Sequence, residues 1–123
     1  MNVLFVCVGN SCRSQMAEGL AKAMGLTAAS AGTHPAAKVA AHALTLLESR
    51  GIDTTGMRPQ SIDDFQPDRF DKVISMGCGV HCPAIKIDED WGLEDPVGAD
   101  YEVYERTAEE IERRLRALLA QAS

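Results

Sequence analysis

An apolar run that is followed, after a short connecting segment, by a helical pattern is the feature that most restricts the fold of this chain. Residues 3–7 are continuously apolar, which is typical of a strand covered on both faces. From Met16 onward, small and apolar residues recur at helical spacing until Gly25, where the helix is expected to end. A buried strand that leads into a helix through residues 8–14 predicts the first unit of a parallel α/β sheet.

The rest of the chain continues this alternation of strand and helix. Residues 27–31 predict a second short strand, and a helix is expected to open at Pro35 and to end at Gly51. Residues 71–76 predict a third strand. Loops are expected between residues 77 and 98, around one further strand near 86–88. From about Ala99, an amphipathic pattern predicts a final helix whose apolar stripe covers the sheet.

Length and charge limit the organisation and the partners of the chain. Its 123 residues fit one domain, residues 1–123. A formal net charge of -6 leaves no broad basic surface for nucleic acid or anionic lipid. No uncharged stretch is long enough for a bilayer span, and the residues after Met1 lack the pattern of a secretory signal. We therefore expect a cytoplasmic protein that binds neither nucleic acid nor membranes.

The junction between the first strand and the first helix combines a cysteine, a glycine-containing loop and an arginine. Its residues are, in order, Cys7, Val8, Gly9, Asn10, Ser11, Cys12, Arg13 and Ser14. A loop that enters a helix N-terminus at the carboxyl end of a parallel strand presents N–H groups that suit a tetrahedral oxyanion. Arg13 adds a planar fork of donors for two oxyanion oxygens. We therefore predict an oxyanion site formed by Val8 to Ser14.

The same positive environment favours the thiolate form of Cys7 and makes this residue a candidate nucleophile. Ser14 is expected to donate its hydroxyl hydrogen to the sulfur, and Asn10 to hold the loop through its side-chain amide. The alternative is a buried cysteine beside a surface arginine, which is common for either residue alone. Their spacing across a strand-to-helix turn favours the anion site. Cys12 is expected to be a small packed residue, with a regulatory thiol as the alternative.

Two further cysteines, Cys78 and Cys82, follow the predicted third strand. Their loop is therefore expected to open on the same edge of the sheet as Cys7. In a reducing compartment, two close pairs of cysteines indicate redox chemistry or metal binding more than a structural disulfide. A zinc site formed by all four cysteines is the less favoured alternative, because Arg13 adjoins one of them.

At these residues the chain resembles the low-molecular-weight protein tyrosine phosphatase superfamily, whose signature is a cysteine, five residues and then Arg-Ser. The stretch from Gly9 to Glu18 is most similar to the thiol-dependent arsenate reductases of that superfamily. The similarity extends to Ser30-Ala31-Gly32 and to residues 91–96. It implies a three-layer α/β sandwich, in which helices cover both faces of a four-stranded parallel sheet.

The resemblance also implies an activity, the reduction of arsenate to arsenite. Cys7 would attack arsenic, Cys78 would attack the sulfur of Cys7, and Cys82 would resolve the disulfide by thiol–disulfide exchange. Thioredoxin is the expected reductant, with mycothiol or glutaredoxin systems as alternatives. The protein is expected to be a monomer without a tightly bound cofactor. Family members that bind potassium do so at positions matching Asn10, Glu18 and Ser30.

Asp95, which precedes Pro96, takes by resemblance the role of general acid that protonates the departing oxygen. Phosphotyrosine phosphatases of the superfamily carry aromatic residues directly after this Asp-Pro pair, whereas Val97 and Gly98 follow here. Without an aromatic wall, an aryl phosphate is expected to bind poorly, while a small inorganic oxyanion loses no contact. The alternative function is a tyrosine phosphatase with a redox-sensitive cysteine pair. Trp91 is expected to pack beneath the Asp95 loop.

Overall fold

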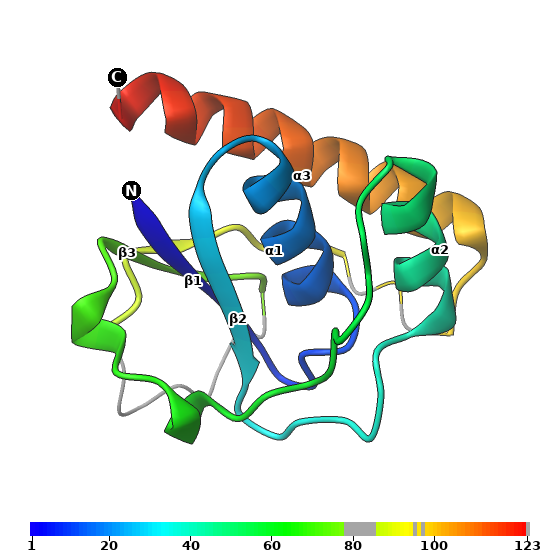
Figure 1. Ribbon diagram of the computed structural model, residues 1–123, viewed down its shortest axis with the longest axis horizontal. Coiled ribbons are helices and arrows are strands. Elements are labelled where there is room, and N and C mark those ends of the chain that lie inside the picture. Colours follow the sequence, from blue (N-terminus) through cyan, green and yellow to red (C-terminus); the bar gives the residue numbers. More distant parts are fainter. Residues whose placement is uncertain (78–85, 95, 97, 123) are drawn as a thin grey trace.

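The computed structural model describes residues 1–77, 86–94, 96 and 98–122. Within these residues, the sheet consists of parallel strands in the order β2-β1-β3-β4 (Figure 1). The strands are β1 (Asn2–Cys7), β2 (Thr27–Gly32), β3 (Lys72–Ser75) and β4 (Glu89–Asp90). The predicted four-stranded parallel sheet is therefore confirmed.

The first strand, β1, lies in the interior of the sheet, which explains its unbroken apolar sequence. It pairs with β2 on one edge and with β3 on the other, so that Val6 lies between Ala31 and Ser75. The side chains of residues 3–6 are all fully buried. A strand whose two faces are both covered has no position for a polar side chain.

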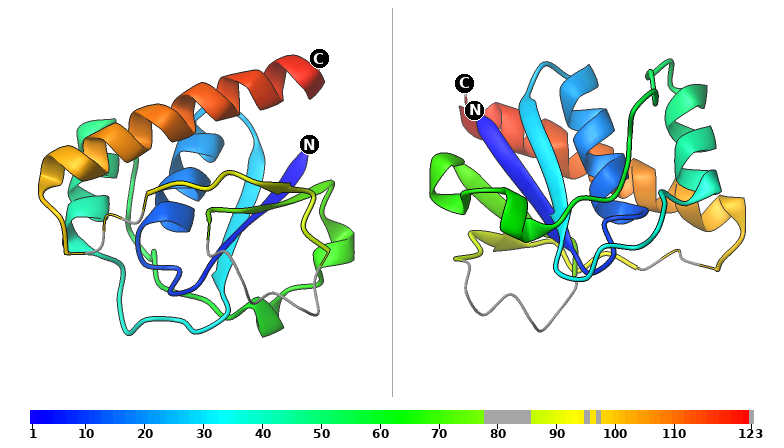
Figure 2. Two further views of the ribbon diagram at one scale, coloured as in Figure 1. Left: turned by 180° about the vertical axis from the view of Figure 1, so that it is seen from behind. Right: turned by 60° about the horizontal axis from the view of Figure 1, so that its bottom comes forward.

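Helices cover both faces of the sheet, but in different forms (Figure 2). On one side lie three α-helices: α1 (Arg13–Ala23), α2 (Ala41–Ser49) and α3 (Tyr101–Ala122). Their buried side chains share one core with Val3 and Phe5. On the other side, Leu4 and Val6 are packed by a smaller set that includes residues of the segment with two short 3-10 helices, η1 (Ile62–Asp64) and η2 (Pro67–Arg69). The predicted three-layer arrangement is confirmed.

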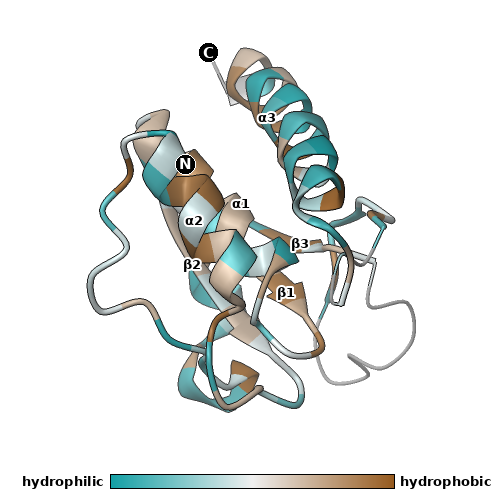
Figure 3. Cartoon of the chain, turned by 90° about the vertical axis from the view of Figure 1, so that its right-hand side faces the viewer, coloured by the Kyte–Doolittle hydropathy of each residue, from teal (hydrophilic) through white to brown (hydrophobic). Residues whose placement is uncertain are grey.

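The final helix, α3, begins at Tyr101, close to the predicted start near Ala99. Ile111 and Leu115 are fully buried, and the helix packs along α1. Its outward side is largely hydrophilic, whereas much of β1 is coloured as hydrophobic (Figure 3). Among the described residues, no helix combines the length and the apolar character that a membrane crossing requires.

The predicted start of the second helix is wrong, because α2 begins at Ala41 and not at Pro35. The residues before it are engaged in long-range pairing. The N–H of Ala36 donates to the carbonyl of Gly9 at 2.9 Å, and the N–H of Ala40 donates to that of Ser11 at 2.8 Å. These residues therefore support the loop that follows β1.

The fourth strand also differs from its prediction, since β4 lies at Glu89–Asp90 rather than near 86–88. Asp88 caps the start of this pairing. Its N–H donates to the carbonyl of Val73, and its carboxylate accepts from the N–H of the same residue, both at 2.8 Å. The regular ladder with β3 therefore begins only after Asp88.

Candidate active site

The candidate oxyanion loop, residues 8–12, connects the carboxyl end of β1 with the first residue of α1. The residue at the N-cap position, Cys12, places no side-chain hydrogen bond on the first turn of the helix. Within the described part of the chain, the backbone N–H groups of Gly9 and Ser11 donate to no protein atom. The loop and the helix N-terminus therefore offer N–H donors of the kind that bind anions.

Two hydrogen bonds converge on the sulfur of Cys7, a residue that is only 3% exposed. The backbone N–H of Asn10 donates to Sγ at 3.2 Å. The hydroxyl oxygen of Ser14 lies 2.8 Å from the same sulfur. The structure thus places Ser14, the predicted partner, beside the sulfur of Cys7. The contact from the backbone N–H of Asn10 was not predicted from the sequence.

The direction of the contact between Ser14 and Cys7 follows from the surrounding hydrogen bonds. The backbone N–H of Gln60 donates to Oδ1 of Asn10 at 2.8 Å, which identifies the oxygen of that amide. Its nitrogen, Nδ2, then donates to Oγ of Ser14 at 2.7 Å. Since Oγ accepts from Asn10, its own hydrogen is available for the sulfur. Both contacts therefore supply donors to a thiolate at Cys7.

The backbone of the loop contains one left-handed residue and passes very close to β2. Asn10 is fully buried and adopts a left-handed conformation with a φ of 50°, which asparagine tolerates better than most residues. At the end of β2, a Cβ atom on Gly32 would lie 2.6 Å from the carbonyl oxygen of Val8. Only glycine permits this approach of β2 to the loop. Sequence analysis did not assign this role to Gly32.

Arg13 joins the loop to the ends of two other strands. Its side chain is buried, and Nη1 donates to the carbonyl oxygens of Met76 and Leu93, each at 3.0 Å. Met76 directly follows β3, and Leu93 lies shortly after β4. The guanidinium group is therefore held at the carboxyl edge of the sheet, where a ligand of a parallel α/β sheet is expected. Sequence analysis predicted the location of Arg13 but not these acceptors.

A sequence model that describes the low molecular weight phosphotyrosine protein phosphatases matches residues 2–123. The chain belongs to this family. The resemblance inferred from residues 7–14 is thereby confirmed, and so is the fold that it implied.

Relatives and solved structures of this family match the chain over nearly its full length. The glutaredoxin arsenate reductase of Synechocystis sp. is 41% identical over 129 residues, with 98% of each chain covered. Arsenate reductase 1 of Staphylococcus epidermidis is 32% identical over 119 residues, covering 89% of this chain and 88% of the relative. A solved structure described as an arsenate reductase in the phosphate binding state has 41% identity and a TM-score of 0.89, with 99% of this chain and 98% of that chain covered.

The remaining loop residues differ in exposure. Val8 is 43% exposed, directly beside the buried Cys7. Cys12 is 3% exposed and belongs to the main core, so its predicted packing is confirmed. In the part of the chain that is described, neither Cys7 nor Cys12 forms a disulfide.

Three predicted site residues, Cys78, Cys82 and Asp95, lie outside the described residues.

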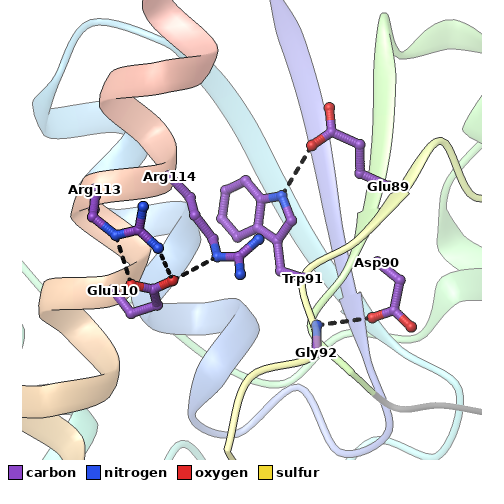
Figure 4. Close-up of polar contacts among 7 residues, drawn as sticks. All are labelled: Glu89, Asp90, Trp91, Gly92, Glu110, Arg113 and Arg114. Atoms are coloured by element: carbon purple, nitrogen blue, oxygen red, sulfur yellow. Dashed lines mark hydrogen bonds and ion pairs between the residues drawn. The ribbon is translucent and has the colours of Figure 1, made fainter.

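The segment before Asp95 is well anchored by Trp91, which packs on Phe5 with ring centroids 5.7 Å apart. The guanidinium of Arg114 lies over the indole ring, 5.9 Å from its centroid, and the indole N–H donates to Glu89 at 3.1 Å (Figure 4). Trp91 is therefore a buried packing residue. Its predicted place beneath the Asp95 loop stays a prediction, because Asp95 lies outside the described residues.

The residues of the predicted potassium site already contact other groups. Glu18 accepts from the hydroxyl of Ser30 at 2.6 Å and pairs with the ammonium of Lys22 at 2.7 Å. Oδ1 of Asn10 accepts from the backbone of Gln60 and from the side chain of Gln15. Among the described residues there is no group of three or more His, Cys, Asp or Glu side chains placed to hold a metal ion. Potassium binding stays a prediction.

Proposed function

We propose that this family member is an arsenate reductase in which Cys7 is the nucleophile. One observation carries the proposal: a chain 41% identical to a glutaredoxin arsenate reductase over 98% of its length holds Cys7 beneath an oxyanion loop, with two donors on its sulfur. Such donors stabilise a thiolate, which is the reactive form of a cysteine nucleophile.

Arsenate is an anion, whereas the chain carries a formal net charge of -6. Binding must therefore depend on local donors. The N–H groups of Gly9 and Ser11, the N-terminus of α1 and the guanidinium of Arg13 lie around the end of β1. Together they supply hydrogen-bond donors and positive charge for a tetrahedral oxyanion.

The proposed chemistry begins with attack of the Cys7 thiolate on arsenic. A sulfur–arsenic bond forms, one arsenic–oxygen bond breaks, and Asp95 supplies a proton so that the oxygen leaves as water. Cys78 then attacks the sulfur of Cys7. The sulfur–arsenic bond breaks, its electron pair stays on arsenic, and arsenite leaves as a Cys7–Cys78 disulfide forms. Two thiols have thus been oxidised while arsenic(V) has been reduced to arsenic(III).

The relay continues when Cys82 attacks Cys78 and releases Cys7 as a thiol. The resulting Cys78–Cys82 disulfide is reduced by an external thiol system. Thioredoxin was the reductant predicted from the sequence, but the Synechocystis relative is named for glutaredoxin. We therefore propose a thiol reductant of one of these two classes, with glutaredoxin the first to be tested.

The matched family description supports a second candidate, phosphotyrosine hydrolysis. Such an enzyme would use Cys7, Arg13 and Asp95 in the same way and would not require Cys78 or Cys82. Its aromatic substrate would have no aromatic partner at Val97 or Gly98. This absence in the sequence favours the small inorganic oxyanion.

Product analysis with cysteine variants tests the proposal. Arsenite would be measured for the wild type with glutathione and glutaredoxin, and separately with thioredoxin and its reductase. Cys7→Ser is expected to abolish turnover. Cys82→Ser, in a single turnover without added thiol, is expected to release about one arsenite per chain and to retain a Cys7–Cys78 disulfide, which peptide mapping detects.

The phosphatase alternative gives a different pattern. Rapid hydrolysis of aryl phosphate, no thiol oxidation that depends on arsenate, and full activity in Cys78→Ser would together contradict the reductase. Undiminished multiple turnover of arsenate by Cys78→Ser would contradict the relay alone.

A further inference from the structure

Gln15 is a buried polar residue whose role sequence analysis did not predict. It lies in the first turn of α1 and is 2% exposed. Its amide nitrogen contacts three carbonyl-type oxygens: the backbone oxygen of Asn10 at 3.1 Å, Oδ1 of Asn10 at 3.0 Å, and the backbone oxygen of Arg58 at 2.8 Å. All three are acceptors only, so this end of the amide must be the nitrogen.

These contacts place both oxygens of Asn10 on Gln15, while both donors of Asn10 are directed toward Cys7. The backbone N–H of Asn10 reaches the sulfur directly, and its side-chain nitrogen reaches Ser14, which contacts the sulfur. Gln15 is therefore one residue removed from the sulfur. It contacts the residue that orients both donors.

Gln15 also connects the loop to a distant segment of the chain. Arg58 accepts from Gln15, the N–H of Gln60 donates to Asn10, and the carbonyl of Gln60 accepts from the N–H of Gly32 at 2.8 Å. A cavity of about 530 Å³ between α1 and residues 51–60 borders Gln15.

We propose that Gln15 is a positioning residue: it holds Asn10 in its left-handed conformation and thereby keeps two hydrogen-bond donors on the sulfur of Cys7. Left-handed backbone is unfavourable for residues other than glycine unless surrounding contacts stabilise it. Without the amide of Gln15, Asn10 loses a partner for each of its oxygens. The inference rests on the proposed function only in taking Cys7 as the nucleophile.

The pH dependence of Cys7 alkylation by iodoacetamide, followed by peptide mapping, tests this inference in the full-length protein. Gln15→Leu removes the amide and keeps a side chain of similar size. Loss of one donor to a charged group predicts a midpoint raised by roughly one pH unit, and alkylation roughly tenfold slower below the midpoint. Gln121→Leu makes the same change on the exposed side of α3 and is expected to keep the wild-type midpoint.

A second variant, Gln15→Glu, keeps the shape of the side chain but brings an oxygen to the three acceptors. It is expected to raise the midpoint at least as far as Gln15→Leu. Circular dichroism and thermal unfolding establish whether each variant is folded. If Gln15→Leu does not fold, the alkylation midpoint of Gln15→Glu tests the inference alone. A folded Gln15 variant with the wild-type midpoint would overturn the inference.

Alkylation needs no arsenate, so this outcome is independent of the proposed reductase activity. A raised midpoint in a protein that fails to reduce arsenate would uphold the role of Gln15 and contradict the proposed function. A wild-type midpoint in a Gln15 variant, together with arsenate reduction by the wild-type protein, would support the reductase and contradict the positioning role of Gln15.

Discussion

The loop after β1 and the segment 89–94, which begins with β4, are held in place by different kinds of interaction. Asn10 and Ser14 in the first region are fully buried, and their hydrogen bonds lie inside the protein. The second region is anchored by two buried side chains, Trp91 and Leu93, and by partly exposed charges. Glu89 pairs with Lys72. Arg114 lies over the indole (Figure 4). The two regions meet where Arg13 donates to Leu93.

This difference predicts that the geometry around Cys7 and the placement of the residues before Asp95 respond differently to solution conditions. Buried hydrogen bonds are strong and insensitive to salt, so the geometry around Cys7 should vary little with solution conditions. Ion pairs at the surface are weak and screened. The residues that precede Asp95 therefore depend chiefly on the packing of Trp91 and Leu93, with a small contribution from charge.

The largest effect is expected at the anchor of the second region. Trp91→Ala would remove the contact with Phe5 and leave a cavity in the main core, lowering the unfolding free energy by about 3–5 kcal/mol. Urea denaturation measures this value. Trp91→Phe retains most of the buried area and should cost clearly less. Equal losses in the two variants would show that packing is not the main anchor.

Arg13, where the two regions meet, is expected to show the next largest effect. Arg13→Lys keeps the charge but cannot reproduce the planar group that reaches Met76, Leu93 and an oxyanion together. The kcat/KM for arsenate should fall about 10²- to 10³-fold, as for loss of an oxyanion donor. Arg116→Lys, an exposed change on α3, provides the matched control. A loss smaller than about threefold would remove Arg13 from the anion site.

A pair of variants at Asn10 separates backbone strain from hydrogen bonding in the first region. Asn10→Gly and Asn10→Ala both lose the side-chain contacts with Ser14, Gln15 and Gln60. Only alanine also meets the unfavourable φ of 50°. The alanine variant should be less stable than the glycine variant by about 1 kcal/mol in urea denaturation. Equal stabilities would show that the loop relaxes out of the left-handed conformation.

The smallest effect is expected from the ion pair at the start of β4. The hydrogen bond from Lys72 holds the pKa of Glu89 below its ordinary value of 4.5. Stability from this pair is therefore present above pH 4.5 and is lost as the pH falls through the lower folded-state pKa. Because both side chains are partly exposed, the contribution should be below about 1 kcal/mol.

Unfolding of Glu89→Gln and of the wild type, measured across this pH range at low and high salt, checks the expectation. The difference between the two proteins should shrink as the pH falls and also as salt is added. A difference that is independent of both would assign the stabilisation to packing rather than to charge.

Much of the site followed from local sequence. The apolar run 3–7 and the helical spacing from Met16 predicted the strand and the helix, and the spacing from Cys7 to Arg13 predicted the loop between them as an anion site. Each of these patterns depends on residues that are neighbours in the chain. The start of α2 was mispredicted at Pro35. Helical propensity there competes with hydrogen bonds from Ala36 and Ala40 to the loop, and such long-range partners cannot be recognised in a local pattern.

The sequence by itself determined the buried central strand, the amphipathic last helix and the cysteine–arginine spacing, since hydrophobic periodicity and turn chemistry act over a few residues. Tertiary structure alone decided that Gln15 contacts Arg58, that Gly32 must lack a side chain, and that Arg13 reaches Leu93. These contacts join segments far apart in the chain, and they form only when the parallel strands bring their carboxyl ends to one edge of the sheet.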